Sequence, residues 1–296
     1  MRRIFLFLGI LLLSISVSFA GSQNKKAQKY YDKAVEYFTA QNYGKAESKL
    51  LKAIDKDPNF SDAYLLLAKV YAKTSQIDKC QQYASKAYEL TNGNNAEVLE
   101  LMYELAAYNK DKKGMEKYGF ELLKLKGQNA TRTEIGRMEQ LAIQYFQMGN
   151  MKKAEQIYET IMQAKPDYTY AYLNLGKIYI AMKNYNKAKT VLERGVAAGV
   201  DNEDIDFILA SMYCNEFKEY KKAMPLLEKL INSNSKYKKD AYSYLINACK
   251  ETESLDKGIE ICTNFIKEFP EDKLTPEVKK RLEQFKKVKE AQKTKK

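Results

Sequence analysis

The sequence predicts an all-α solenoid of about seven helix–turn–helix repeats, and three observations lead to this fold class. The chain resembles itself about every 34 residues, most clearly over Thr169–Asp201. Within each copy, large aromatic and small residues recur at spacings that suit two packed helices. Glycine and proline are sparse, at 13 and 5 of 296 residues, as expected of a chain that is mostly helical.

Residues 1–20 have the pattern of a secretory signal peptide. Arg2 and Arg3 precede an apolar run, Ile4–Val17, and Ser18-Phe19-Ala20 supplies small residues where a signal peptidase cleaves. The apolar run is about 14 residues long, whereas a membrane-spanning helix needs roughly 20. We therefore expect cleavage after Ala20 and a protein exported to the periplasm or another part of the cell envelope. A retained segment that tethers the chain to a membrane is the alternative.

After a short linker, residues 21–26, the seven repeats fill residues 27–272. Each repeat is expected to form a hairpin of a first and a second helix, and the repeats start near residues 27, 61, 96, 135, 169, 203 and 239. A small residue at repeat position 8 faces a small residue at position 20, where the two helices approach most closely. An aromatic at position 11 fills the space beside them. Position 8 is filled by Ala34, Ala68, Ala142, Gly176 and Ala210, position 20 by Ala46, Cys80, Ala154 and Ala188, and position 11 by Tyr37, Tyr71, Tyr145, Tyr179 and Tyr213.

This set of positions resembles the tetratricopeptide repeat family, and closing prolines at Pro58, Pro166 and Pro270 add to the resemblance. The resemblance implies a right-handed superhelix whose concave groove is lined by the first helices. It also implies a scaffold that binds other proteins and catalyses nothing.

Two repeats depart from the pattern. In the third, Tyr103 and Met115 occupy the two small positions, so we expect that hairpin to be splayed or altered in pitch. The sixth needs one added residue, within Phe217–Lys222, to bring Ala223 into register.

Residues 273–296 form a basic capping helix and tail. Thr275 is expected to cap the helix, and Val278, Leu282, Phe285 and Val288 form an apolar stripe that covers the last repeat. The basic side of this helix is a candidate contact for an anionic membrane surface, although a solvated polar face is the interpretation we favour.

Composition excludes several classes of function. The chain has no histidine, which removes Ser-His-Asp and Cys-His catalysis and imidazole metal sites, and no P-loop or dinucleotide-binding motif is present. We expect no enzyme activity, no metal and no cofactor. Of the net charge of +12, residues 273–296 carry +7 and residues 21–272 only about +3, so no nucleic-acid partner is expected.

Four cysteines leave two interpretations open. Cys80, Cys214, Cys249 and Cys262 form no C-x-x-C pair, so a zinc site is poorly supported. The favoured interpretation is four small core residues. A Cys249–Cys262 disulfide within the seventh repeat is the alternative in an oxidising compartment.

The resemblance also implies which residues face the groove, because repeat positions 2, 5, 9 and 12 commonly do so in that family. The candidate groove residues are Tyr31, Phe38, Leu65, Lys69, Glu100, Glu104, Glu139, Ile143, Phe146, Tyr170, Leu173, Lys177, Phe207 and Asn247. Apolar groups alternate with carboxylates, which favours a protein or peptide partner with apolar anchors and some positive charge. The identity of that partner is not predicted, and self-association stays open.

Overall fold

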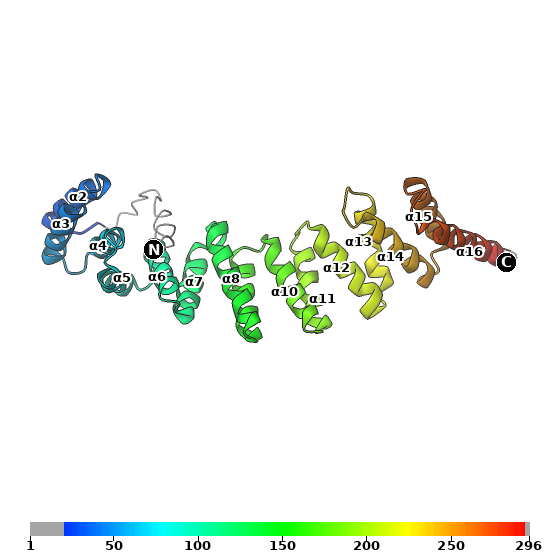
Figure 1. Cartoon of the computed structure of the whole chain (residues 1–296), viewed down its shortest axis with the longest axis horizontal. Helices are drawn as coiled ribbons and strands as arrows, with labels where there is room; N and C mark the ends of the chain where they lie inside the picture. Colours follow the sequence, from blue (N-terminus) through cyan, green and yellow to red (C-terminus); the bar gives the residue numbers. More distant parts are fainter. Residues whose placement is uncertain (1–20, 294–296) are drawn as a thin grey trace. The chain divides into compact units, whose positions relative to one another are not determined.

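The structure, a computed structural model, describes residues 21–293, and these residues contain helices and turns but no strand (Figure 1). The predicted all-α fold of helix hairpins is confirmed. The chain divides into two compact units, one ending at Gln147 and the other beginning at Met148, and each unit is described by itself. The predicted signal segment, residues 1–20, lies outside the described residues.

The first unit contains three hairpins and one further helix. The hairpins pair α2 (Lys25–Thr39) with α3 (Tyr43–Lys56), α4 (Ser61–Lys73) with α5 (Ile77–Thr91), and α6 (Ala96–Tyr108) with α7 (Lys112–Lys126). A single 3₁₀ turn, η2 (Gly127–Asn129), then leads to α8 (Arg132–Gln147).

The turn inside each hairpin is made in the same way from one hairpin to the next. A residue in the left-handed conformation ends the first helix, as at Gln41 with φ of 58° and Lys183 with φ of 57°. In the first hairpin of each unit, an asparagine follows and caps the second helix: the side chains of Asn42 and Asn184 accept hydrogen bonds from the backbone N–H groups of Lys45 and Lys187. This local chemistry reverses the chain within a few residues and sets two helices side by side.

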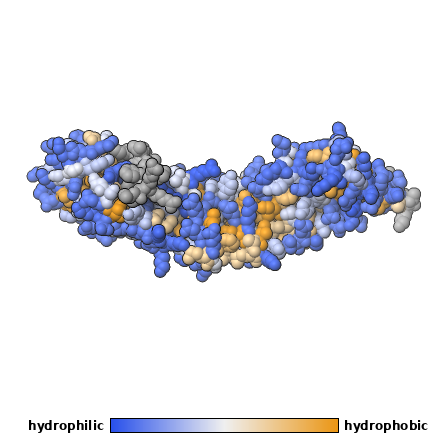
Figure 2. Space-filling model, in the orientation of Figure 1, coloured by the Kyte–Doolittle hydropathy of each residue, from blue (hydrophilic) through white to orange (hydrophobic). Residues whose placement is uncertain are grey.

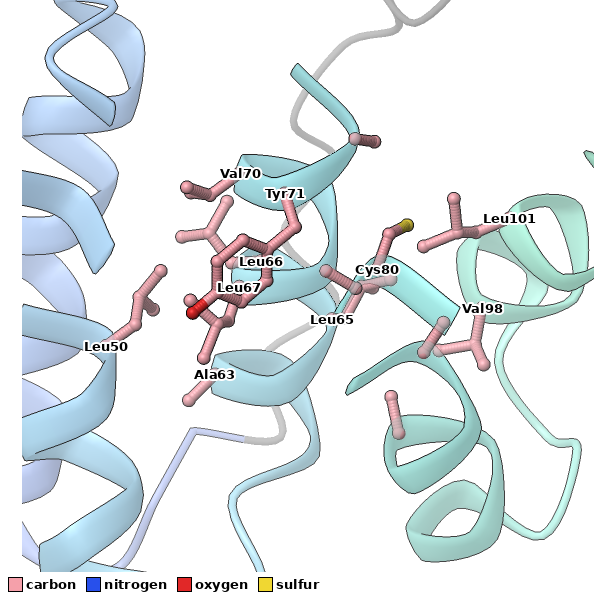
Figure 3. Packing of buried hydrophobic residues seen from close by; sticks show 14 of the residues in the cluster. Leu50, Ala63, Leu65, Leu66, Leu67, Val70, Tyr71, Cys80, Val98 and Leu101 are labelled. Carbon is pink, nitrogen blue, oxygen red and sulfur yellow. The ribbon is translucent and has the colours of Figure 1, made fainter. Parts of the chain in front are cut away.

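The core of the first unit lies between consecutive hairpins. Leu67 and Tyr71 of α4 point toward Leu50 of α3, while Leu65 points to the other side, toward Cys80 of α5 and the start of α6 (Figure 3). Because α4 is buried on both sides, its sequence reads as nearly continuous apolar residues.

In the third hairpin, the two helices approach closely beside the turn that joins them. The small-to-small contact has moved along the helices: a Cβ added at Gly114 of α7 would lie 2.9 Å from the Cβ of Ala106 on α6. Tyr103, which occupies the expected small position, is buried at 5% exposure. The close approach therefore survives at Ala106 and Gly114, a different pair from the one that the repeat pattern indicates.

The second unit contains α9 (Met151–Ala164), three hairpins and a final helix. The hairpins pair α10 (Thr169–Ala181) with α11 (Tyr185–Ala197), α12 (Glu203–Met212) with α13 (Tyr220–Ile231), and α14 (Lys238–Glu251) with α15 (Leu255–Glu268). The closing helix is α16 (Thr275–Lys293).

The added residue of the sixth repeat is absorbed by a π-helical turn. This turn, η3 (Tyr213–Phe217), continues α12 and ends at Lys218, which is left-handed with φ of 56°. A π turn accommodates one extra residue without breaking the helix. Ala223 consequently returns to register and is fully buried.

Helix α16 covers the last hairpin. Phe285 is 3% exposed, and its ring lies so close to Gly258 of α15 that an added Cβ there would be 2.7 Å from it. Val288, at 48% exposure, lies outside this contact. Thr275 begins the helix, but its hydroxyl donates to the carbonyl of Phe269 at 2.5 Å and does not accept a bond from the first turn. None of the helices described is long and apolar enough to cross a membrane.

Consecutive hairpins are linked by a recurring polar contact, which we call the joint. In the first joint, the Tyr71 hydroxyl donates to the carboxylate of Glu47 on the preceding second helix at 2.8 Å. The ammonium of Lys79, from the same hairpin as Tyr71, lies 5.0 Å from the centre of the Tyr71 ring, within the range of a cation–π contact.

The same three groups recur in the second unit. Tyr179 and Lys187 meet Glu155 of α9, and the Tyr213 hydroxyl donates to Glu193 of α11 while Lys222 lies over the Tyr213 ring. Burial and the neighbouring carboxylate raise the pKa of Tyr71, Tyr179 and Tyr213 well above the usual value. Part of the tyrosine content of the chain therefore serves to link hairpins.

Candidate partner-binding surface

The candidate groove residues lie on the first helices of the hairpins, and the structure separates them into three groups besides the ion-paired residues Lys69, Glu100 and Glu104. Leu65 and Leu173 are only 6% and 2% exposed, so they belong to the core and are not available to a partner. This corrects their assignment to the groove. An apolar residue at repeat position 5 can face either the groove or the neighbouring hairpin, and here neighbouring side chains cover both leucines.

A second group consists of half-buried aromatic residues that pack against neighbouring side chains. Tyr31 lies 4.9 Å, ring centre to ring centre, from Phe60, and burial raises its pKa. Phe38 meets Tyr43 edge-on at 5.7 Å. These rings present only part of their surface to solvent. Phe146 and Glu139, both on α8, are half-buried as well.

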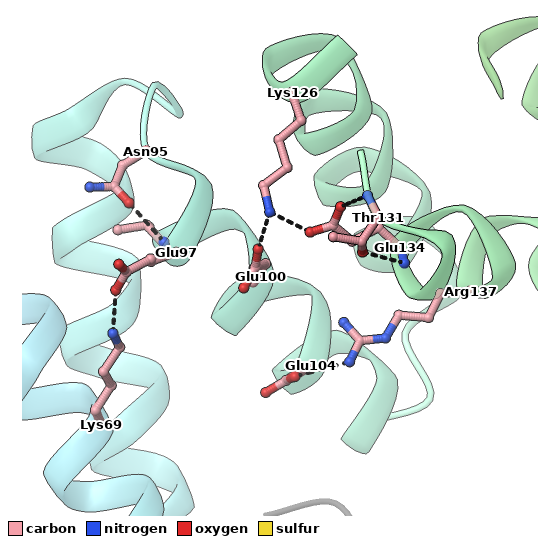
Figure 4. Close-up of polar contacts among 10 residues, drawn as sticks. Lys69, Asn95, Glu97, Glu100, Glu104, Lys126, Thr131, Glu134 and Arg137 are labelled. Atoms are coloured by element: carbon pink, nitrogen blue, oxygen red, sulfur yellow. Dashed lines mark hydrogen bonds and ion pairs between the residues drawn. The ribbon is translucent and has the colours of Figure 1, made fainter. Parts of the chain in front are cut away.

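The carboxylates of the third hairpin are engaged in ion pairs within the first unit. Glu97 pairs with Lys69 of α4, and Glu104 pairs with Arg137 of α8 at 3.2 Å (Figure 4). Lys126, at the end of α7, pairs with Glu100 of α6 at 2.6 Å. Basic side chains of the chain itself therefore pair with this acidic stretch.

Lys126 also pairs with Glu134, which is only 6% exposed and begins α8. Thr131 and Glu134 form a capping box: the Thr131 N–H donates to the Glu134 carboxylate at 2.7 Å, and the Thr131 hydroxyl accepts from the Glu134 N–H at 3.3 Å. Burial raises the pKa of Glu134, but the hydrogen bonds from Lys126 and Thr131 outweigh it, so the net shift is downward. In Glu100, burial dominates and the pKa is raised.

Sequence reasoning missed Lys126, Glu134 and Arg137. Lys126 lies at the end of a second helix, outside the positions that usually face a groove. The T-x-x-E pattern at residues 131–134 was the one available signal, since it marks a helix start and explains a buried glutamate.

The third group is exposed. In the first unit it contains Ile143 of α8, at 41% exposure. In the second unit it contains Tyr170, at 47% exposure, Lys177 on α10 and Asn247 on α14. Figure 2 shows a mostly hydrophilic surface broken by hydrophobic patches, so exposed apolar side chains are a minority.

Phe207 of α12 is half-buried and packs against two other aromatic residues of the second unit. Its ring stacks on Tyr237 with centres 4.2 Å apart and meets Tyr244 of α14 edge-on at 5.9 Å. The Tyr237 hydroxyl donates to Asp204 at 2.7 Å, and Lys236 pairs with the same carboxylate, which lowers the pKa of Asp204. The result is an aromatic group from α12 and α14, which we call the aromatic platform: Phe207 of α12, Tyr237 at the N-cap of α14 and Tyr244 within α14.

The chemistry of the described cysteines and acidic residues is limited. No cluster of three or more His, Cys, Asp or Glu side chains suited to a metal is present within residues 21–293. The four cysteines are free and buried, and burial raises their thiol pKa values to about 11 or 12. Neither nucleophilic thiolates nor a metal centre is therefore formed by the described residues.

Comparison with known proteins gives matches to repeat models and to one curated protein. Two family models described as tetratricopeptide repeat match residues 49–82 and 145–210. Superkiller protein 3 of Schizosaccharomyces pombe is 22% identical over 279 residues, which cover 86% of this chain and 20% of that protein. The chain thus spans about a fifth of the curated relative it matches.

Solved structures with a similar arrangement of helices include two tetratricopeptide repeat proteins. One, from Parabacteroides merdae, has a TM-score of 0.40 and 14% identity, with 88% of this chain and 98% of that chain covered. The other, YrrB, described as having an unusual peptide-binding site, has a TM-score of 0.40 and 17% identity, with 60% of this chain and 89% of that chain covered.

Proposed function

Since the chain is a tetratricopeptide repeat protein, we propose that it is a non-catalytic scaffold that binds a protein partner through the first helices of its second unit. The observation that carries the proposal is the aromatic platform together with the exposed residues Tyr170, Lys177 and Asn247 on first helices of the same unit. Rigid aromatic side chains flanked by exposed polar groups are the usual anchors of a protein interface.

The binding mechanism is preorganisation. Phe207 is held by Tyr237, and Tyr237 is held by its bond to Asp204, so the anchor loses little side-chain entropy when a partner binds. Lys177 and Asp240 are exposed and have no ion-pair partner among residues 21–293, so both signs of charge are available beside the platform. A helical or extended segment with an apolar anchor and mixed charge fits this surface.

We further propose that the scaffold works in the cell envelope after export. This rests on the sequence of residues 1–20 alone, and a membrane-tethered docking protein that retains its apolar run Ile4–Val17 is the alternative. Intact mass of the protein from its own cells separates the two. A mass that begins at Gly21 supports export with cleavage, and a mass that includes residues 1–20 supports the tether.

Site-specific crosslinking tests the binding surface. A photoreactive amino acid at Tyr170, on the first helix, is compared with one at Thr190, an exposed residue of the second helix α11. We expect a single dominant adduct from position 170 and none from position 190. Equal adducts from both positions, or a Phe207→Ala variant that keeps the adduct at full yield, would contradict the proposal.

A further inference from the structure

In later hairpins, one face of the first helix packs against the second helix of the preceding repeat, and the equivalent face of the first hairpin is different. Repeat position 7 is Leu67, Leu175 and Leu209 in later hairpins, each between 0% and 2% exposed against the preceding second helix. In the first hairpin the same position is Lys33, which is exposed. The face that elsewhere forms the contact between repeats is thus not covered by any residue within 21–293, and it is charged.

This face is basic over both helices. On α2, Lys26, Tyr30, Lys33 and Tyr37 recur at intervals of three and four residues and so share one side of the helix. On α3, Lys45, Lys49 and Lys52 do the same. The Lys45 ammonium lies 5.6 Å from the Tyr37 ring and the Lys49 ammonium 5.9 Å from the Tyr30 ring, so the two rows adjoin. We call these seven residues the lysine face.

No carboxylate of the described chain neutralises the lysine face. The acidic residues of α2, Asp32 and Glu36, lie on another side of the helix. None of the five lysines forms an ion pair within residues 21–293, whereas Lys187, Lys189 and Lys222, at comparable places in the second unit, all do. Residues 1–20 contain neither Asp nor Glu and therefore have no carboxylate side chain to offer.

The joints show what would complete this face. In each of three joints, a tyrosine at repeat position 11 is hydrogen-bonded to a glutamate on the preceding second helix, and a lysine eight or nine residues later lies over the tyrosine ring. In one of the three, Lys187 also pairs with that glutamate, Glu155. The first hairpin has the same tyrosine and lysine, Tyr37 and Lys45, in contact with each other. Its tyrosine hydroxyl makes no hydrogen bond to a described residue, in contrast to Tyr71.

From this comparison we propose that the lysine face binds an acidic amphipathic helix of a partner protein, in the place that the second helix of a preceding repeat takes elsewhere. A glutamate of that helix accepts a hydrogen bond from Tyr37 and pairs with Lys45, and further carboxylates meet Lys26, Lys33, Lys49 and Lys52. The site is separate from the aromatic platform and does not depend on the scaffold function proposed above.

Charge decides between the candidate occupants. Stacking of a second copy through its final helix would bring Lys279, Lys280, Lys286 and Lys287, all exposed on α16, toward the lysine face, and like charges repel. A purely apolar helix would have to bury Lys33, where later hairpins have leucine, at a high desolvation cost. An acidic helix avoids both penalties and makes charge-assisted hydrogen bonds.

The test uses a labelled peptide as the acidic helix. Residues 150–165 form α9 and its caps, and this helix carries Glu155, which completes the joint with Tyr179 and Lys187. The probe is this peptide with Lys152→Glu, Lys153→Glu and Lys165→Glu, titrated with the full chain at low ionic strength and followed by fluorescence anisotropy. We expect saturable binding that weakens about tenfold with Glu155→Gln in the peptide or Lys33→Glu in the protein.

Matched variants keep the result interpretable. Lys33 is exposed, so Lys33→Glu should fold normally, which circular dichroism checks. Lys267→Glu makes the same charge change at an exposed position of α15 and should leave binding unchanged. Tyr37→Phe removes only the hydroxyl and should weaken binding by a smaller factor.

Three results would overturn the proposal. One is the absence of saturable binding, and another is equal weakening by Lys267→Glu and Lys33→Glu. The third is a combined result: the protein does not bind the peptide, but it sediments with vesicles of phosphatidylglycerol and phosphatidylcholine in a way that depends on Lys33. That last result would assign the lysine face to an anionic membrane surface.

Discussion

Gly176→Leu offers a sharp test of how the hairpins are packed. Gly176 lies in the middle of α10, and a Cβ added there would be 2.7 Å from the Cδ2 atom of Leu192 on α11 and 2.9 Å from its Cγ atom. Real Cβ contacts are longer, so α10 and α11 must separate or Leu192 must leave its position. Both positions are fully buried, and no solvent-filled space receives the displaced atoms.

The expected cost combines two opposing effects. Leucine in place of glycine inside a helix gains up to about 1 kcal/mol of helix propensity. Overpacking of a close helix contact costs more, and the net destabilisation should be about 2–4 kcal/mol. The matched control is Gly136→Leu, in the interior of α8, where nothing lies within 4 Å of the added Cβ. That variant should be stabilised or unchanged.

Urea denaturation followed by circular dichroism at a helical wavelength measures both variants. The two units can unfold separately, so each transition is fitted with its own slope. We expect a lowered midpoint for Gly176→Leu in the transition of the second unit alone. A shift near zero, or a shift of the same sign and size for Gly136→Leu, would show that α10 and α11 do not meet at Gly176.

Three further predictions concern polar groups and thiols. Lys126→Met should destabilise the first unit by about 2 kcal/mol. This is less than the cost of breaking a fully buried ion pair, because the side chains of Lys126 and Glu100 are 22% and 24% exposed. The control, Lys124→Met on the exposed side of α7, should be neutral in the same assay. The raised pKa values of Tyr71, Tyr179 and Tyr213 mean that the stability these residues contribute is complete below the unfolded-state pKa near 10 and is lost as the pH rises above it. The urea midpoint should therefore fall between pH 9 and 11, by about the amount that the linkage of proton binding to folding requires. It should fall less steeply in a variant with all three tyrosines changed to phenylalanine. All four cysteines should resist a thiol reagent at pH 8 in the native state, because burial raises their pKa values, and all four should react in urea; two reactive thiols in urea would instead reveal a Cys249–Cys262 disulfide.

The fold could be predicted because the repeat pattern records contacts between residues close in sequence. A small residue at position 8 and another at position 20 face each other within one hairpin, so their spacing alone indicates two packed helices. The third hairpin shows the limit of this reasoning. Ala106 and Gly114 take over the close approach there, and only the register of α6 against α7 reveals the exchange.

The candidate surface was less predictable because it depends on contacts between hairpins. Leu65 and Leu173 occupy positions that commonly face a groove, but the neighbouring hairpins cover them. The carboxylates of Glu100 and Glu104 suggested an acidic site, and the residues that neutralise them, Lys126 and Arg137, lie 26 and 33 residues further along the chain. Sequence spacing does not show that such distant side chains meet.

The joints have a consequence for how a chain of this kind can change in length. Each joint involves only two consecutive hairpins, and the tyrosine, lysine and glutamate that form it are supplied in the same order each time. If residues 169–202 were removed, Glu155 of α9 would precede Tyr213 and Lys222 directly, and the same three kinds of group would meet again. Insertion or loss of one whole hairpin therefore requires no new chemistry at the point of fusion, so such proteins can be shortened or extended by single modules.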